Sequence, residues 1–169
     1  MKRIGYLYEK IYTKENIELA IKNARRGKNT KEIQWVISNE PECIDIIHRQ
    51  LKNKTFVNSE YLRFTKLDKG KEREISVLPF FPDRIIHHAI VQILEPIWIK
   101  VLIKDTYQSI KGRGVHKAKK KLEHNLRKNQ YKYCLKIDIK KFYPSIDNEI
   151  LKQIIKRKIK DKDTLLVVR

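Results

Sequence analysis

The run Tyr131–Asp138, YKYCLKID, limits the possible folds more than any other part of the sequence. Its apolar and aromatic residues alternate poorly with polar ones, which is typical of a strand buried on both faces. Helices are expected before and after it, so the order of elements is helices, hairpin, helices, strand, helix. The sequence therefore predicts an α+β domain with this run as a central strand.

The predicted strand ends on a carboxylate, Asp138. An isolated charge is costly to bury, so we expect the side chain to emerge at the end of the strand and meet a cation. One candidate is Mg²⁺, which is held by a few carboxylates together with substrate oxygens. The alternative is a salt bridge to Lys136 or Lys140, or a turn cap.

The chain is strongly basic, with 39 Lys and Arg against 20 Asp and Glu in 169 residues and a net charge of +19. Aliphatic residues are plentiful, so the chain is expected to fold. A folded protein with this charge usually meets a polyanion, and nucleic acid is the first candidate. The alternative is a lysine-rich protein without such a partner.

Targeting and membrane segments are not expected. The N-terminal stretch MKRIGYLYEKIY has no uninterrupted apolar run of the kind that a secretory signal needs. The most apolar run, AIVQILEPIWIKVLI, contains Glu95, Pro96 and Lys100, which is too polar for a membrane span. Cys43 and Cys134 have no metal-binding spacing and are interpreted as buried, reduced thiols. These features predict a cytoplasmic protein without a membrane partner.

Periodicity and breaker residues predict the remaining elements. The segment YLRFTKLDKGKEREISVLP reads as two strands around the turn LDKGKE, a β-hairpin. The expected helices run from Thr13 to near Gly27, from Thr30, after Pro41, from Pro82, along the apolar stripe Val115, Ala118, Leu122 and Leu126, and from about Asp147 to Lys160. Asp147 is expected to cap the last of these rather than to bind a metal ion.

The segment KGRGVHKAKKKLEHNLRK is a second basic feature, with eight Lys or Arg among its eighteen residues and Glu123 as its acidic residue. Most of its lysines lie off the apolar stripe, where they could follow a nucleic-acid backbone. The candidate contacts are Lys111, Arg113, Lys117, Lys119, Lys120 and Lys121. For any single lysine the alternative is an ordinary solvated face.

Three blocks of the chain, over about residues 60–155, resemble reverse transcriptases of the group II intron, retron and diversity-generating types. DIKKFYPSID is similar to their first catalytic motif, motif A. KGKEREISVLPFFPDRIIHHAIVQILEPI resembles their fingers segment, and TYQSIKGRGVHKA resembles the loop that follows it. The resemblance implies a helical N-terminal extension (residues 1–59), a fingers subdomain (60–130) and the start of the palm (131–169) of a right-hand polymerase fold.

The resemblance also implies roles around motif A. Asp138 would be the first metal-binding aspartate, bridging two Mg²⁺ ions between a primer 3′-hydroxyl and a dNTP. The carbonyl of Ile139 would be a further ligand, and the amides of Lys140 and Lys141 would face the phosphates. Tyr143 would lie under the sugar and exclude a 2′-hydroxyl. The implied partners are an RNA template, a DNA primer and a dNTP.

In the hairpin, Lys66 and Arg73 match the pair that grips the incoming triphosphate in this family, and Lys71 is a weaker third. Strands flanking a turn can aim a point charge and a guanidinium fork at the same phosphates. Without the resemblance, a solvated charged hairpin explains the same residues equally well.

The sequence departs from the family in one important respect. It contains no Tyr-x-Asp-Asp, the motif that supplies the second carboxylate pair. One aspartate cannot hold two magnesium ions, so we expect no DNA synthesis by these residues alone. The alternatives are a non-catalytic RNA-binding remnant and a defence protein of the abortive-infection type on the same fold. A bacterial or phage-type element is the expected source.

Overall fold

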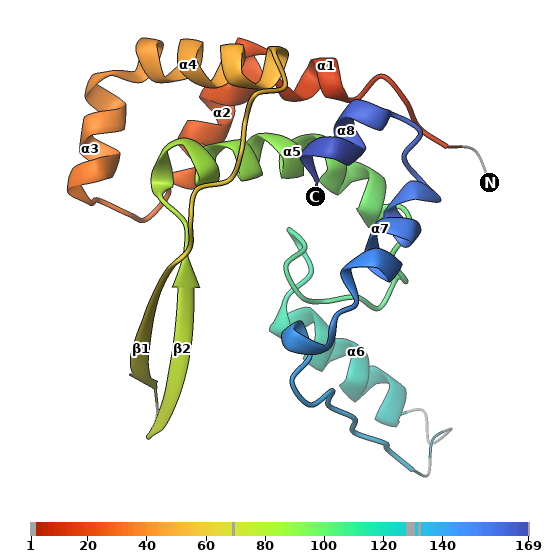
Figure 1. Cartoon of the computed structure of the whole chain (residues 1–169). Helices are drawn as coiled ribbons and strands as arrows, with labels where there is room; N and C mark the ends of the chain where they lie inside the picture. Colours follow the sequence, from red (N-terminus) through yellow and green to blue (C-terminus); the bar gives the residue numbers. More distant parts are fainter. Residues whose placement is uncertain (1–2, 69, 128–130, 132, 169) are drawn as a thin grey trace. The chain divides into compact units, whose positions relative to one another are not determined.

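The computed structural model describes residues 3–68, 70–127, 131 and 133–168 (Figure 1). The chain forms two compact units, one from the residues up to Glu95 together with those from Ile154 onward, and the other from Pro96 to Gln153. The described α-helices and strands are α1 (Tyr8–Ile11), α2 (Lys14–Ala24), α3 (Lys31–Ser38), α4 (Glu40–Lys52), β1 (Leu62–Asp68), β2 (Lys71–Val77), α5 (Ile85–Ile99), α6 (Val115–Arg127), α7 (Asn148–Lys156) and α8 (Lys162–Val167). A π-helical turn (Phe80–Arg84) precedes α5, and a short 3₁₀ helix (Tyr143–Ser145) precedes α7. Helices and one antiparallel sheet are both present, as an α+β domain requires, whereas the polymerase subdomains stay a prediction.

Helices α2 and α3 begin where the sequence predicts them, whereas α4 begins at Glu40, just before the expected break at Pro41, and α5 begins at Ile85 rather than at Pro82. Thr13 caps α2 by accepting a hydrogen bond from the amide of Asn16 (3.3 Å), and Thr30 caps α3 in the same way through Ile33 (3.3 Å). Pro41 lies in the first turn of α4, where a missing N–H has no effect. The fully buried core side chains include Ile11, Ile17, Ile21, Val36, Ile47, Leu51, Ile85 and Ile86.

The predicted hairpin is confirmed. Strands β1 and β2 pair antiparallel from Leu62 opposite Val77 to Asp68 opposite Lys71. Gly70 at the turn has a φ of +77°, a left-handed conformation that glycine adopts without steric strain. Lys69 lies outside the described residues. Figure 1 shows the hairpin extending from the helices of its own unit.

The last part of the chain folds back onto its beginning. Ile4 donates its amide proton to the carbonyl of Lys158 (2.8 Å) and accepts one from the amide of Lys160 (2.7 Å). Between these two bonds, Ile159 is fully buried. The helix expected from Asp147 to Lys160 is therefore wrong in its last four residues, because α7 ends at Lys156 and a turn and a short bridge follow before α8.

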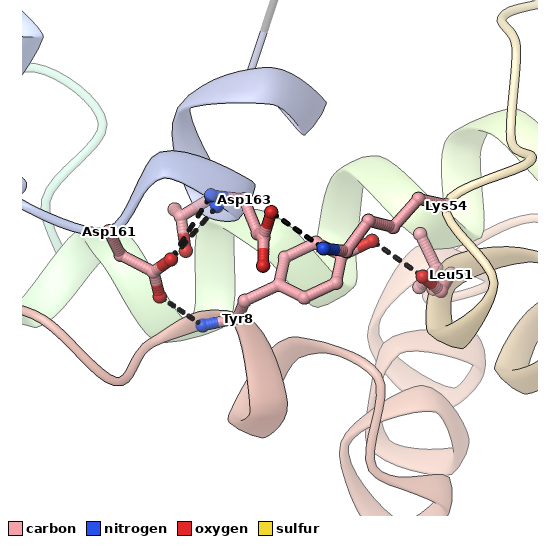
Figure 2. A network of polar contacts seen from close by, with 6 residues as sticks. Tyr8, Leu51, Lys54, Asp161 and Asp163 are labelled. Carbon is pink, nitrogen blue, oxygen red and sulfur yellow. Dashed lines mark hydrogen bonds and ion pairs between the residues drawn. The ribbon is translucent and has the colours of Figure 1, made fainter.

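A carboxylate then joins two helix starts (Figure 2). Asp161 accepts hydrogen bonds from the amides of Leu7 (2.9 Å) and Tyr8 (2.8 Å) at the start of α1. The same side chain caps α8 by accepting from the amides of Asp163 (3.2 Å) and Thr164 (3.4 Å). We call this arrangement the Asp161 clasp.

Two further contacts support the clasp. The hydroxyl of Tyr8 donates to the carbonyl of Leu51 at the end of α4 (2.6 Å). The Lys54 ammonium lies 2.8 Å from an Asp163 carboxylate oxygen, and Figure 2 shows both near the Tyr8 ring. These contacts join the first helix, the end of α4 and the last helix into one compact unit.

The expected central strand is not formed. Residues 131 and 133–139 are neither helix nor strand, and Tyr133, Leu135 and Ile137 are 94%, 82% and 75% exposed. Cys134, expected to be buried, is exposed as well, whereas Cys43 is buried. A strand forms only where a neighbour pairs its amides and carbonyls, and in the described part of the chain no strand lies beside these residues. Lys132 lies outside the described residues.

Helices α6 and α7 begin where the sequence predicts them. Helix α6 covers the expected apolar stripe, although Val115, Leu122 and Leu126 are exposed rather than packed. Asp147 caps α7, as predicted, by accepting hydrogen bonds from the amides of Glu149 (2.8 Å) and Ile150 (3.0 Å). Among the helices that the structure describes, none is both long enough and apolar enough to cross a membrane.

Candidate nucleic-acid interface

The hairpin gathers its three candidate phosphate contacts on one face. Lys66 and Arg73 are directly opposite each other in the strand register. Lys71 lies two residues before Arg73 and therefore on the same side of the sheet, because side chains alternate along a strand. All three side chains are exposed. We call Lys66, Lys71 and Arg73 the hairpin cations; their role in binding phosphate stays a prediction.

An acidic residue orients one of these cations. The Nε atom of Arg73 lies 3.0 Å from a carboxylate oxygen of Asp68, which is on the same face near the turn. Both side chains are about half exposed, so the pair adds little stability but holds the guanidinium beside Lys66. The opposite face carries Arg63, which lies 4.0 Å from Glu74.

Buried and polar contacts tie the base of the hairpin to the helices. Asp83, which follows β2, is fully buried and accepts hydrogen bonds from the amide (2.8 Å) and the hydroxyl (2.7 Å) of Ser59, which precedes β1. The amide of Phe81 donates to Glu32 of α3 (3.1 Å), and the Phe81 ring packs edge-on against Trp35. Both ends of the hairpin are therefore fixed.

Sequence reasoning missed the role of Asp83. The residue belongs to the Pro-Asp-Arg stretch that contributes to the family resemblance, but its partner is 24 positions earlier in the chain. The available signal was its position: a carboxylate just after the second strand can reach the residue just before the first strand, because a hairpin brings its two ends together. We call the contact between Asp83 and Ser59 the hairpin latch.

The motif A residues lie on an exposed segment of the second unit. Asp138, Ile139 and Lys140 are exposed, and Tyr143 is 83% exposed with its ring edge-on to Phe142 (5.3 Å between centroids). Lys141 has a φ of +51°, and its carbonyl accepts a hydrogen bond from the Ser145 hydroxyl (2.6 Å). This turn carries the chain from Asp138 to the start of α7.

Within the described ranges, no group of three or more His, Cys, Asp or Glu side chains is placed to hold a metal ion. Asp138 therefore has no carboxylate cluster around it in that part of the chain. A magnesium pair needs several anionic oxygens from the protein. The described residues do not by themselves fit a two-magnesium site.

The third candidate group lies along α6 and the loop before it. Lys111, Lys117, Lys119, Lys120 and Lys121 are exposed to solvent. Arg113 is half-buried and donates to the carbonyl of Lys104 (3.3 Å), so it also holds the loop together. Lys119 pairs weakly with Glu123 one turn later (3.7 Å). Lys128 lies outside the described residues.

Comparison with known proteins adds one distant similarity. No family model matches the chain. Over 101 residues, 59% of its length, the chain is 26% identical to nuclear intron maturase 1, mitochondrial, of Arabidopsis thaliana. The chain spans about 14% of the length of that protein. The chain is thus distantly similar to part of an intron maturase.

Proposed function

We propose that this chain supplies the nucleotide- and RNA-binding part of a reverse-transcriptase-like protein. The single observation that carries the proposal is the shared face of the hairpin cations, where Lys66 and Arg73 are cross-strand neighbours. The resemblance of three ordered blocks to reverse transcriptases supports it, as does the similarity to an intron maturase, whose name implies association with intron RNA.

The hairpin cations would act on the triphosphate of a dNTP. A lysine supplies a compact charge, whereas the arginine fork can donate two parallel hydrogen bonds to one phosphate. Because Lys66 and Arg73 are cross-strand neighbours on one face of the sheet, both side chains can reach a single triphosphate chain. The hairpin latch and the bond from Phe81 to Glu32 would hold the hairpin cations in a fixed orientation while the ligand binds.

Motif A would contribute the chemistry-bearing residues of the complete protein. Asp138 would provide one carboxylate ligand and Ile139 a carbonyl ligand for Mg²⁺, which activates the primer hydroxyl and neutralises the leaving pyrophosphate when bound. The amides of Lys140 and Lys141 would approach the phosphates, and Tyr143 would select against a 2′-hydroxyl. The exposed lysines of α6 would follow the backbone of the template or primer.

A hairpin variant tests the proposed nucleotide contact. We expect Arg73→Ala, measured by calorimetric titration of the 169-residue chain with a dNTP, to weaken binding about 10-fold, because a hydrogen bond to a charged group contributes about 1.5 kcal/mol or more. Lys66→Ala is expected to have a similar effect. The matched control is Arg63→Ala, which removes the same charge from the opposite face of the same hairpin. An equal loss for Arg63→Ala would show that only the net charge matters.

A non-catalytic RNA-binding function is the second candidate. It is favoured because Asp138 is exposed and the described residues place no metal-binding group of three or more acidic, His or Cys side chains around it. The two candidate functions can be distinguished in a protein that also carries the other catalytic carboxylates of the reverse transcriptase family. There, Asp138→Asn is expected to reduce primer extension more than about 100-fold, since even the outer partners of metal ligands contribute about 10- to 100-fold. RNA binding measured on the same protein should stay unchanged. Full extension by the variant would leave the RNA-binding function as the better explanation.

A further inference from the structure

A second basic cluster lies on the first unit, where the chain leaves α2 and passes the start of α5. Gln92 of α5 accepts a hydrogen bond from Asn23 near the end of α2 (2.7 Å) and donates one to the side chain of Asn16 (2.9 Å). These bonds fix one side of α5 against α2, and the bond to Asn23 places Gln92 beside the end of that helix.

Three cationic side chains meet at this place. His88 precedes Gln92 by four residues, so the two share one side of α5. Arg84 is the last residue of the π-helical turn that leads into α5. Lys28 follows the end of α2, and its ammonium donates to the carbonyl of Ala24 (3.3 Å). Lys28 and Arg84 are exposed and His88 is half-buried.

The electrostatics of the cluster agree with this placement. Burial, and then the charge of Arg84, lowers the pKa of Lys28. Burial lowers the pKa of His88 as well, and the charges of Arg84, Lys28 and His87 lower it further. The charges of Arg84 and Lys28 are thus close enough to act on the neighbouring groups of the cluster, and the electrostatic potential there is positive.

No acidic side chain neutralises these cations within the part of the chain that the structure describes. Neither Lys28 nor Arg84 forms an ion pair there. Asp83 is adjacent to Arg84 in sequence, but its carboxylate is buried and bonded to Ser59. Mutually repelling cations without a counter-charge favour a bound anion, which removes the repulsion.

We propose that Lys28, Arg84 and His88 form a site for one backbone phosphate of RNA. Arg84 supplies a guanidinium fork, Lys28 a point charge and His88 a ring N–H donor, which suits the oxygens of a phosphodiester. Only the choice of RNA as the carrier of the phosphate rests on the function proposed above. The residues are separate from the hairpin cations, so the two contacts can succeed or fail independently.

The test is titration of a short fluorescent single-stranded RNA with the full chain, followed by anisotropy at several salt concentrations. The double variant Lys28→Gln, Arg84→Gln is expected to bind RNA about 10-fold more weakly, with a log–log salt slope less steep by about 0.7 for the lost phosphate contact. The matched control is Lys22→Gln, Lys31→Gln, which removes two exposed charges from the same unit and should change affinity less than about 2-fold. An equal loss in both double variants would overturn the site.

Two further arms identify the ligand and the role of His88. Acid favours the charged form of the ring and so does a bound phosphate, so lowering the pH should increase the RNA affinity of the wild type more than that of His88→Gln. Equal gains would remove His88 from the site.

Titration with inorganic tripolyphosphate distinguishes a free phosphate ligand: loss of tripolyphosphate binding in Lys28→Gln, Arg84→Gln with unchanged RNA binding would overturn the RNA assignment. Normal RNA binding by Arg73→Ala together with weak binding by Lys28→Gln, Arg84→Gln would leave this site standing without the hairpin contact.

Discussion

Replacing Asp83 by alanine is expected to lower the free energy of unfolding of the first unit by about 3 to 5 kcal/mol. The variant loses two hydrogen bonds from Ser59 to a fully buried carboxylate. Hydrogen bonds to charged groups contribute about 1.5 to 3 kcal/mol each, and the Ser59 amide and hydroxyl would lose their acceptor. Urea denaturation followed by circular dichroism measures the change.

The same variant should also loosen the hairpin itself. Spin labels at Glu72→Cys on the hairpin and Glu42→Cys on α4, in a Cys134→Ser background, report the distance between two exposed sites of one unit. We expect a narrow distance distribution in the parent and a broad one after Asp83→Ala, under conditions where both proteins are folded. A loss of stability alone would not broaden the distribution of the folded protein.

Two control variants set the scale for the latch. Ser59→Ala removes the hydroxyl but keeps the amide, so its effect should be about half that of Asp83→Ala. Asp68→Asn removes an exposed ion pair at the tip of the hairpin and should cost less than about 1 kcal/mol. A narrow distribution and unchanged stability in Asp83→Ala would contradict the latch.

The parts of the fold that could be predicted from sequence are those specified by neighbouring residues. Thr13 and Thr30 mark helix starts because each cap bonds an amide only three positions later. The hairpin follows from two β-rich runs around a turn in which Gly70 adopts a left-handed conformation. The strand expected from Tyr131 to Asp138 failed because strand formation depends on a pairing partner, which the local sequence does not reveal.

The candidate site, too, could be predicted from sequence only in part. The register places Lys66 opposite Arg73, but the resemblance, not the geometry, suggested what they bind. The Asp161 clasp and the cluster around Arg84 join residues that are distant in sequence, so no local pattern predicts them. The latch could have been predicted only from the position of Asp83 just after the hairpin. The roles of Asp138 and Tyr143 still rest on the resemblance.

The Asp161 clasp leads to the second large effect. Asp161→Ala removes the acceptor for the amides of Leu7 and Tyr8 and the cap of α8 in one step. Loss of a helix cap costs about 0.5 to 2 kcal/mol, and two helix starts are affected. We therefore expect the free energy of unfolding to fall by about 1 to 4 kcal/mol at neutral pH, measured by urea denaturation.

The clasp also predicts how acid affects stability. Burial alone would raise the pKa of Asp161, but the hydrogen bonds from Tyr8, Leu7 and Thr164 outweigh it and lower the pKa. A carboxyl whose pKa is lower in the folded state stabilises the fold fully above its unfolded value of about 3.9, and this contribution disappears as the pH falls through the folded pKa. The wild type should therefore lose stability below about pH 4, and Asp161→Asn should show a smaller loss over the same range.

A neighbouring carboxylate provides the matched control. Asp163 pairs with Lys54 at the surface, where both side chains are more than a third exposed, so Asp163→Asn should cost less than about 1 kcal/mol. Asp161→Asn and Asp163→Asn each remove one negative charge, at positions two residues apart. Only the Asp161 variant changes the acceptor of the hydrogen bonds to the start of α1. If both changed stability equally, net charge would explain the effect. A large effect confined to Asp161 would show that its hydrogen bonds to Leu7 and Tyr8 hold the start of α1 against the start of α8.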